Sequence, residues 1–212
     1  MRTLELAGTV VFAVSGVLAV ATARLDWFGA IVVGIVTAVG GGSTRDVILD
    51  ATPVFWVENV AYLIAALAGA LLAIPLARVL AKGPRRRFDE ALQLADAAGL
   101  AIFVVTGAEI TRDLGFDAWV AVVAAIISGV GGGVIRDVLA DRTPLILTGE
   151  IYAVAALAGA VVYVLLAEAT ALADWLVVLL GAVTVVGLRA IGIRRQWSLP
   201  GLTPPGGPPH AP

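Results

Sequence analysis

The stretch Val39–Asp50 reads VGGGSTRDVILD, and it recurs 91 residues later at Val130–Asp141 as VGGGVIRDVLAD. Each copy is followed by Thr-Pro, at Thr52-Pro53 and at Thr143-Pro144. The same offset holds without a gap through the preceding residues, where it matches Gly8 with Gly99, Phe12 with Phe103 and Asp26 with Asp117. Such regularity indicates an internal duplication, and the doubled glycine and Arg-Asp motif is the strongest candidate for a functional site.

The composition of the chain indicates the environment in which it folds. It is 60% hydrophobic and 14% charged over 212 residues, which is more apolar surface than a soluble domain of this size can bury. Several stretches approach or exceed the ~20 apolar residues that a membrane-spanning helix needs. The absence of cysteine excludes disulfides and thiolate ligands. The single histidine, His210, lies in a tail rich in proline and glycine. These counts predict an all-α integral membrane protein.

The apolar pattern predicts seven membrane-spanning helices. Their expected ranges are 4–22, 28–49, 59–80, 91–111, 118–140, 150–168 and 171–193. The first three form one repeat (residues 4–80) and the next three form the other (residues 91–168), while the seventh (within 171–195) has no counterpart. A basic linker at residues 81–90 joins the repeats, and we expect residues 198–212 to be disordered.

Three spans per repeat have a geometric consequence, because the second copy must enter the membrane from the opposite side. The repeats are therefore expected to be inverted about a pseudo-two-fold axis in the membrane plane. Positive charges gather on one side of this arrangement, at Lys82, Arg85, Arg86, Arg87, Arg189, Arg194 and Arg195. The positive-inside rule makes that side cytoplasmic, so we expect the N-terminus outside and the C-terminus inside. The basic linker could alternatively bind anionic lipid.

The triple glycines lie within the second and fifth expected helices, at Gly40, Gly41, Gly42, Gly131, Gly132 and Gly133. Three consecutive glycines weaken a helix by about 1 kcal/mol each relative to alanine, so we expect a kink or an unwound turn in both helices. Backbone groups freed there would have to face protein or a wet cavity rather than lipid. The alternative is close helix packing, which small residues also permit.

Charged and hydroxyl side chains surround the glycines. Arg45-Asp46 and Arg136-Asp137 follow the two triplets. Adjacent helical residues do not face each other, so we expect these charges to pair across the repeat axis, or to reach the interface instead. Six hydroxyls could coordinate a passing ion or bond back to their own helix, namely Ser15, Thr37, Ser43, Thr44, Thr106 and Ser128. Four of these are expected along the ion path, namely Thr37, Ser43, Thr44 and Ser128. Glu5 and Asp96 occupy matched positions at expected helix starts, where a carboxylate complements the helix dipole.

Two three-helix repeats, each with GGG-x-x-R-D in the second helix, followed by a seventh helix, resemble the prokaryotic branch of the trimeric intracellular cation channel family. The resemblance covers about 4–193. It implies a homotrimer with a separate pore in each protomer, lined by the kinked second and fifth helices. It also implies passage of monovalent cations, chiefly potassium, past Gly40–Gly42, Arg45 and Asp46 in one repeat and Gly131–Gly133, Arg136 and Asp137 in the other.

The function expected from this resemblance is a passive, potassium-preferring cation channel in a prokaryotic inner membrane. Its partners would be further copies of the chain, membrane lipids and potassium or sodium ions, with no cofactor, no resident metal and no nucleic acid. A secondary transporter of a small zwitterion such as glycine is the alternative, with helix N-termini holding the carboxylate. An enzyme is disfavoured because the membrane domain contains no histidine, no cysteine and no recognisable nucleophile with its base.

Overall fold

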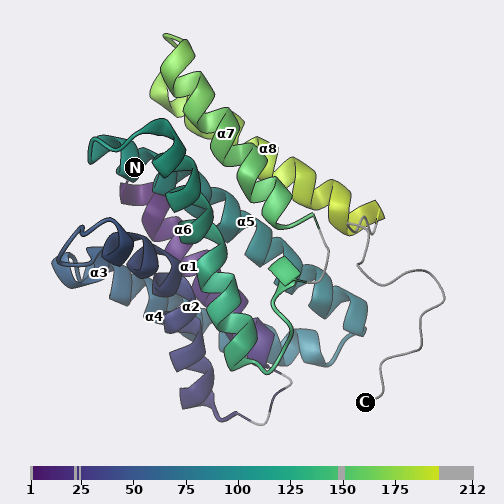
Figure 1. The fold of residues 1–212 in the computed structure, drawn as a ribbon. Helices are drawn as coiled ribbons and strands as arrows, with labels where there is room; N and C mark the ends of the chain where they lie inside the picture. The colour runs from purple at the N-terminus through teal and green to yellow at the C-terminus, as the bar shows by residue number, and fades with distance from the viewer. Residues whose placement is uncertain (1, 22, 24, 148–150, 196–212) are drawn as a thin grey trace, which may run out of the picture.

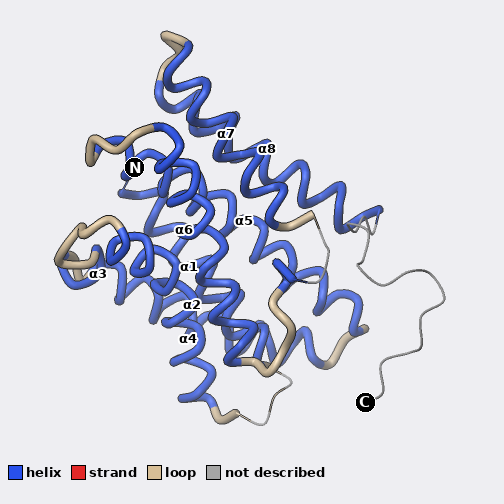
Figure 2. The backbone as a smooth tube through the Cα atoms, viewed as in Figure 1, coloured by secondary structure: helices blue, strands red, loops and turns tan. Residues whose placement is uncertain are grey.

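The computed structural model describes residues 2–21, 23, 25–147 and 151–195, and shows a bundle of helices (Figures 1 and 2). In chain order the helices are α1 (Arg2–Val20), α2 (Trp27–Ile48), α3 (Phe55–Glu58), α4 (Ala61–Ala81), α5 (Arg85–Asp113), α6 (Ala118–Leu139), η1 (Leu145–Leu147), α7 (Ala153–Ala169) and α8 (Asp174–Arg195). Six of them are long and apolar enough to cross a membrane, and α7 is a shorter apolar helix. The expectation of an all-α membrane protein is confirmed.

The main difference from the expected boundaries lies in the basic linker. Helix α5 begins at Arg85, six residues before the expected start, and absorbs most of residues 81–90. Arg85 and Arg86 pair with Asp89 and Glu90 one turn later, at 3.8 and 3.0 Å, and such pairs support an exposed helical turn. At 29 residues, α5 is about 43 Å long, so its polar first turns extend beyond the ~30 Å hydrocarbon core. The expected disorder of residues 198–212 lies outside the described residues.

A short helix follows the Thr-Pro of each repeat. It is α3 in the first repeat and the 3₁₀ turn η1 in the second. The three long helices of the first repeat are therefore α1, α2 and α4, and those of the second are α5, α6 and α7. Helix α8 packs against α5 and α7 of the second repeat. This places α8 outside the repeat symmetry, as the sequence predicts.

The pseudo-two-fold axis passes where matched residues touch each other. Phe12 of α1 stacks on its repeat counterpart Phe103 of α5, with ring centroids 5.2 Å apart. Gly41 of α2 likewise lies against its counterpart Gly132 of α6. Contacts between α2 and α6 are the most extensive of any helix pair. These two helices, which carry the doubled motif, therefore form the centre of the molecule.

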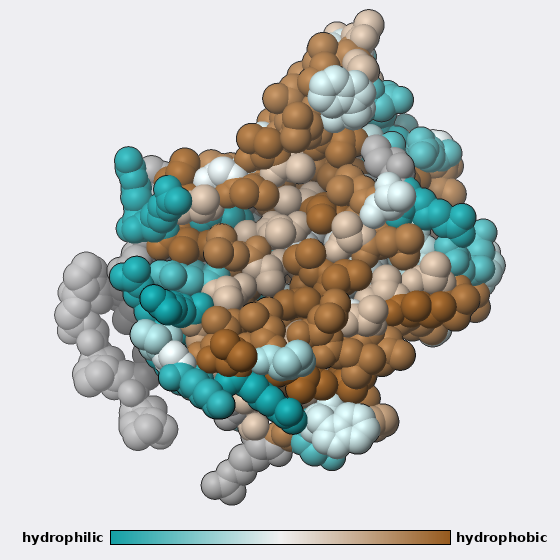
Figure 3. Space-filling model, turned by 180° about the vertical axis from the view of Figure 1, so that it is seen from behind, coloured by the Kyte–Doolittle hydropathy of each residue, from teal (hydrophilic) through white to brown (hydrophobic). Residues whose placement is uncertain are grey.

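The outer surface is apolar, as lipid requires. Large side chains such as Leu72 and Val79 are two-thirds exposed on α4, and Figure 3 shows one face covered mainly by hydrophobic residues with polar ones gathered toward its margins. Trp27, Trp119 and Trp175 are also about two-thirds exposed, each in the first turn of a long helix. Tryptophan at helix ends is typical of the boundary between membrane and water, so these side chains mark where the spans begin.

Candidate functional site

The middle glycine of each triplet is a point of backbone contact between α2 and α6. A Cβ on Gly41 would overlap the carbonyl oxygen of Ser128, and a Cβ on Gly132 would overlap that of Thr37. Thr37 and Ser128 are themselves repeat counterparts, so the contact is symmetric. Both helices are α-helical through the glycines. The expectation of an unwound turn is therefore wrong, because the glycines keep their helical hydrogen bonds and bring two helices close together.

The third glycine of each triplet makes room for a side chain. A Cβ on Gly42 would lie 2.7 Å from the ring of Phe55, and one on Gly133 would lie 2.8 Å from the hydroxyl of Tyr152. The first glycines, Gly40 and Gly131, lie against the side chain of Ile135 and the Cα of Gly41 respectively. Each glycine of both triplets thus has a near neighbour on another segment, so a side chain at any of the three positions would meet that neighbour.

The Arg-Asp pairs form within each helix rather than across the axis. In α2, Arg45 donates from Nε and Nη2 to Oδ1 of Asp46 at 2.9 and 2.6 Å. In α6, Arg136 donates from Nε to Oδ1 of Asp137 at 2.8 Å. The predicted cross-axis pairing is wrong. Neighbouring Cβ atoms do diverge on a helix, but an arginine is long enough to curve back, and all four side chains are buried, where a charge needs a partner.

The second oxygen of each aspartate explains the spacing between Arg-Asp and Thr-Pro. Oδ2 of Asp46 accepts the N–H of Phe55 at 2.9 Å, and Oδ2 of Asp137 accepts the N–H of Leu145 at 3.1 Å. Phe55 and Leu145 are the first residues of α3 and η1, so each carboxylate binds the amide end of the short helix behind Thr-Pro. The doubled motif is therefore partly a folding unit that ties a long helix to the short helix after it.

A Schellman turn ends both helices in front of these short segments. Asp50 and Asp141 hold positive φ angles of 54° and 52°. The N–H of the next residue donates to the carbonyl of Asp46 in the first repeat (2.8 Å) and of Asp137 in the second (2.9 Å). These bonds satisfy carbonyls that a helix end leaves unpaired. The Asp at the end of each quoted stretch is thus the left-handed residue that stops the helix.

The matched carboxylates Asp96 and Glu5 make specific side-chain contacts that the sequence analysis did not predict. Asp96 does not lie at a helix start, because α5 begins at Arg85. It is fully buried, and Oδ1 accepts from Nη1 of Arg136 at 2.5 Å and from the hydroxyl of Tyr152 at 3.3 Å. Its counterpart Glu5 accepts from the hydroxyl of Tyr62 at 2.7 Å. The dipole interpretation of Asp96 is therefore wrong, because its principal partner is the arginine of α6.

The two repeats differ in how far their arginines reach. Arg136 also donates to Oγ of Ser15 at 2.5 Å, so it joins α6 to α1 and α5 as well as to its own aspartate. Beyond Asp46, Arg45 makes one long hydrogen bond within the described part of the chain, from Nη1 to Oγ of Ser128 at 3.4 Å. Among the described residues, Arg136 forms ion pairs with Asp96 and Asp137, whereas Arg45 forms one with Asp46. The second repeat is consequently the more tightly crosslinked.

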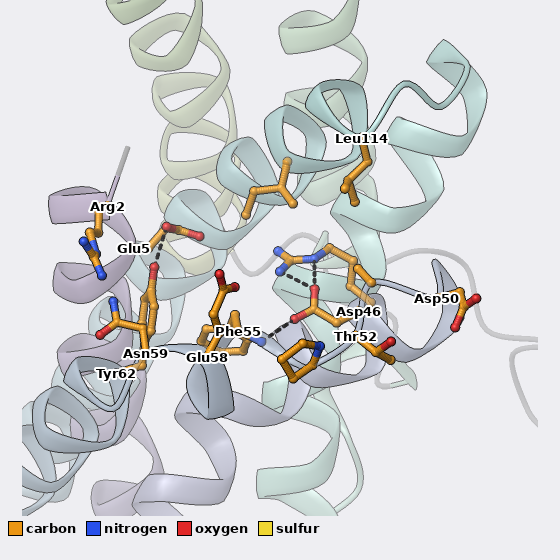
Figure 4. A pocket seen from close by; sticks show the side chains of 14 residues that line it. Arg2, Glu5, Asp46, Asp50, Thr52, Phe55, Glu58, Asn59, Tyr62 and Leu114 are labelled. Atoms are coloured by element: carbon orange, nitrogen blue, oxygen red, sulfur yellow. Dashed lines mark hydrogen bonds and ion pairs between the residues drawn. The ribbon is translucent and has the colours of Figure 1, made fainter.

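The cavities at the ends of the two repeats also differ in size. At the end of the first repeat, a cavity of about 830 Å³ is lined by charged and polar side chains that include Glu5, Arg45, Asp46, Glu58 and Tyr62 (Figure 4). At the end of the second repeat, the corresponding cavity measures about 220 Å³. Its lining residues include Gln93, Asp96, Arg136, Asp137 and Thr143.

The two cavities lie at opposite ends of α5. Ile110 and Leu114 line the larger one, whereas Asp89 and Leu92 line the smaller one. The eighteen residue-to-residue steps from Leu92 to Ile110 span roughly 27 Å of helix axis, which is close to the thickness of a hydrocarbon core. Because one cavity surrounds the C-terminal end of α2 and the other that of α6, the repeats are inverted as the sequence predicts.

The hydroxyl candidates divide into two groups. Thr37, Ser43 and Thr44 donate to carbonyls four residues back at 2.7, 2.7 and 2.8 Å. Ser43 also accepts from Nε1 of Trp56 at 2.8 Å. Thr37 and Ser128 are fully buried at the crossing of α2 and α6, whereas Thr44 is exposed. The structure therefore brings Thr37 and Ser128 to the centre, and places Ser43 and Thr44 toward the outer side.

Sequence reasoning missed the tyrosines that bind the matched carboxylates. Tyr62 and Tyr152 are counterparts once the one-residue deletion between the repeats is counted. The signal was present, because each repeat carries one acidic residue and one tyrosine at corresponding places. An acidic residue within an apolar span is costly and needs a partner, and the shared tyrosine is the first partner that the duplication offers.

Comparisons with known proteins agree on one family. A family model described as "Glycine transporter" matches residues 2–78 and again residues 93–168. The inner membrane protein YadS of Escherichia coli K12 is 43% identical over 202 residues, which covers 93% of each chain. A UPF0126 membrane protein of Deinococcus radiodurans, which carries the same family designation as YadS, shows 41% identity over 92% of this chain and 87% of its own.

Solved structures give the same result at the level of the fold. The trimeric intracellular cation channel orthologue of Rhodobacter sphaeroides matches with a TM-score of 0.85 and 36% identity, covering 92% of this chain and 98% of that one. A structure described as explaining conductance through cation channels of the same type matches with a TM-score of 0.83 and 29% identity, over 98% and 99% of the two chains. A channel of this type from C. elegans, at 16% identity and a TM-score of 0.61, shares the fold.

Proposed function

Because this chain belongs to the family of the prokaryotic trimeric intracellular cation channels, we propose that it is a passive channel for monovalent cations, potassium above all. The chain is a multi-pass protein of the inner membrane. We place one ion path in each protomer of a homotrimer, with the N-terminus outside and the C-terminus in the cytoplasm.

The observation that carries this proposal is the pair of polar cavities at opposite ends of α5. Each is lined by the Arg-Asp pair of one repeat and by the matched carboxylate of that repeat, which is Glu5 in the larger cavity and Asp96 in the smaller one. Buried ionisable groups within a membrane domain are costly and mark polar pathways. Two such cavities, related by the repeat axis and separated by one membrane thickness, support a path that crosses the bilayer.

The path that we propose runs between the cavities along the crossing of α2 and α6. Its wall would include the six glycines and the four hydroxyl residues, with Thr37 and Ser128 nearest the centre. Arg45, Asp46, Arg136 and Asp137 would form its two vestibules. A kink at the glycines stays a prediction, as does the contact of the basic residues near Arg85 with anionic lipid.

Helix α2 contacts α6 directly at Gly41 and Gly132 in this structure. The guanidinium of Arg136 is 1% exposed and joins three helices at the smaller cavity. Conduction through this route therefore requires the two helices to separate locally, and the conformation described is a closed one in our proposal.

Purified protein in planar bilayers under a potassium gradient tests the channel. We expect discrete unitary currents that reverse near the potassium equilibrium potential, because a passive path dissipates the gradient without coupling. The rival function is uptake of a small zwitterion such as glycine, which the description of the matching family model favours. Silent bilayers together with saturable uptake of radiolabelled glycine into liposomes would replace the channel by a transporter.

A further inference from the structure

Asp96 presents one carboxylate oxygen that the protein leaves unused. Its side chain is fully buried in the interior of α5. Oδ1 receives both of its donors, Nη1 of Arg136 and the hydroxyl of Tyr152. Oδ2 is buried and receives no hydrogen bond within the described part of the chain. A buried carboxylate oxygen without a donor is costly, so the position calls for a partner that the protein does not itself provide.

The space for that partner lies beside it. Asp96 lines the cavity of about 220 Å³ at the end of the second repeat, and one water molecule occupies about 30 Å³ of liquid volume. The cavity therefore has room for a small ion with part of its hydration shell.

The lining of this cavity is suited to an alkali cation. Gln93 and Thr143 add neutral oxygens, of the kind that hard cations accept. Both oxygens of Asp137 already hold a donor, from Arg136 and from the N–H of Leu145. Arg136 and Arg142 also line the cavity and limit the negative potential there. Asp89 also lines the cavity, but its side chain is half-exposed and pairs with Arg85 at 3.8 Å. One buried, unused carboxylate oxygen together with neutral oxygens therefore favours a single positive charge over a divalent ion.

We propose that this cavity is a binding site for a partly dehydrated alkali cation, with Oδ2 of Asp96 as the principal ligand. The inference rests on the proposed channel function and deepens it, since the site would hold the ion at the narrow end of the path. Gln93 contributes a secondary, neutral ligand.

The first repeat provides a matched comparison. Glu5 occupies the position of Asp96 but is partly exposed, and its neighbour Tyr62 donates to it as Tyr152 donates to Asp96. Its cavity of about 830 Å³ is large enough for an ion to keep its water. A dehydrated site is therefore expected at Asp96 and not at Glu5.

Crystals of the full-length protein soaked in rubidium chloride give the direct test, because rubidium replaces potassium and scatters anomalously. We expect an anomalous difference peak within coordination distance of Oδ2 of Asp96. Density in the cavity that fits water alone, at a rubidium concentration that saturates any stabilising effect of the ion, would overturn the proposal.

Thermal unfolding in detergent supplies a second readout that does not depend on crystals. Potassium chloride should raise the Tm by about 2–4 °C over choline chloride of equal ionic strength. Asp96→Asn should abolish this difference, Gln93→Leu should reduce it without breaking the ion pair to Arg136, and Glu5→Gln should leave it intact. An equal effect of potassium and choline on the wild-type protein would contradict the site.

The two proposals fail separately. A rubidium peak and a potassium-dependent Tm in a protein that passes no current would retain the cation site and remove the channel. Unitary currents without a peak and without a potassium-specific Tm would retain the channel and remove the site.

Discussion

Two aspartates occupy a backbone conformation that glycine adopts at lower cost. Asp50 and Asp141 are the non-glycine residues with positive φ among those that the structure describes. Each also places a carboxylate at the C-terminal end of a helix, where the helix dipole is negative. The left-handed backbone and the unfavourable dipole contact occur at the same place in each repeat, and Asp50 lines the larger cavity. A charge retained at an unfavourable position points to a role for the charge itself.

Asp50→Gly separates the two effects. The glycine relieves the left-handed strain and the unfavourable dipole contact, so we expect stability to rise by about 0.5–1 kcal/mol, seen as a higher Tm in detergent. Removal of the charge should lower the unitary conductance at low salt, where a negative mouth concentrates cations.

Asp50→Asn is the control, because asparagine tolerates the same backbone conformation and lacks the charge. It should reproduce the loss of conductance with a smaller gain in Tm. Conductance that stays at the wild-type value in Asp50→Asn at low salt would show that the aspartate acts only as a helix stop.

The triple glycines show how an element is specified by its neighbour. Their helix propensity is poor, yet α2 and α6 continue through them because each helix is braced by the backbone of the other. The sequence indicated their position and symmetry, but not whether they break the helix or allow close helix packing. Propensity is a property of one helix, whereas the contact of Gly41 with Ser128 and Gly132 belongs to the pair.

Alanine at the crossing tests this interpretation. Gly41→Ala and Gly132→Ala should each destabilise the protein by about 1–3 kcal/mol, because the added methyl meets a backbone carbonyl of the facing helix that cannot rotate away. The measurement is thermal unfolding in detergent, with unitary current as a second readout.

Gly187 in α8 is the matched control, because a Cβ there meets no atom within 4 Å. Gly187→Ala should leave the Tm unchanged or raise it by the equivalent of up to about 1 kcal/mol. Equal effects of the three substitutions would mean that helix propensity, and not the contact, decides the stability.

Other parts of the site depended on distances that a sequence does not contain. The spans, their order and the inversion followed from apolar length and from the duplication. The pairing of Arg45 with Asp46 did not, because a rule about Cβ directions underestimates how far a guanidinium can turn. Asp96 was misjudged because the start of α5 was placed six residues late, which put a buried residue at an apparent helix end.

At the scale of the whole molecule, the arrangement of charges predicts a direction through the membrane. The basic residues near Lys82 and Arg194 should face the cytoplasm, and the turn after α5 should then face outward. The polar beginning of α5 extends beyond the hydrocarbon core on the side of Lys82. The larger cavity, which contains Leu114, is accordingly the external one in this orientation.

The lack of cysteine in the chain allows a simple topology test. Phe116→Cys, in the turn between α5 and α6, should react with a membrane-impermeant maleimide in intact cells. Lys82→Cys should react only after the membrane is permeabilised. The opposite labelling pattern would reverse the orientation, and labelling of both positions in intact cells would indicate that the chain inserts in two directions.

The unequal cavities have a consequence for the shapes that the molecule can adopt. Both repeats carry an acidic residue, a tyrosine, an arginine and an aspartate at matched positions, yet the cavity beside them measures about 830 Å³ in the first repeat and about 220 Å³ in the second. Each repeat thus shows a local geometry that the matched residues of the other repeat could adopt. Exchanging the two local geometries would give a second conformation of the protein, in which the end of the second repeat is wide and the end of the first repeat is locked, built from arrangements that this chain already contains.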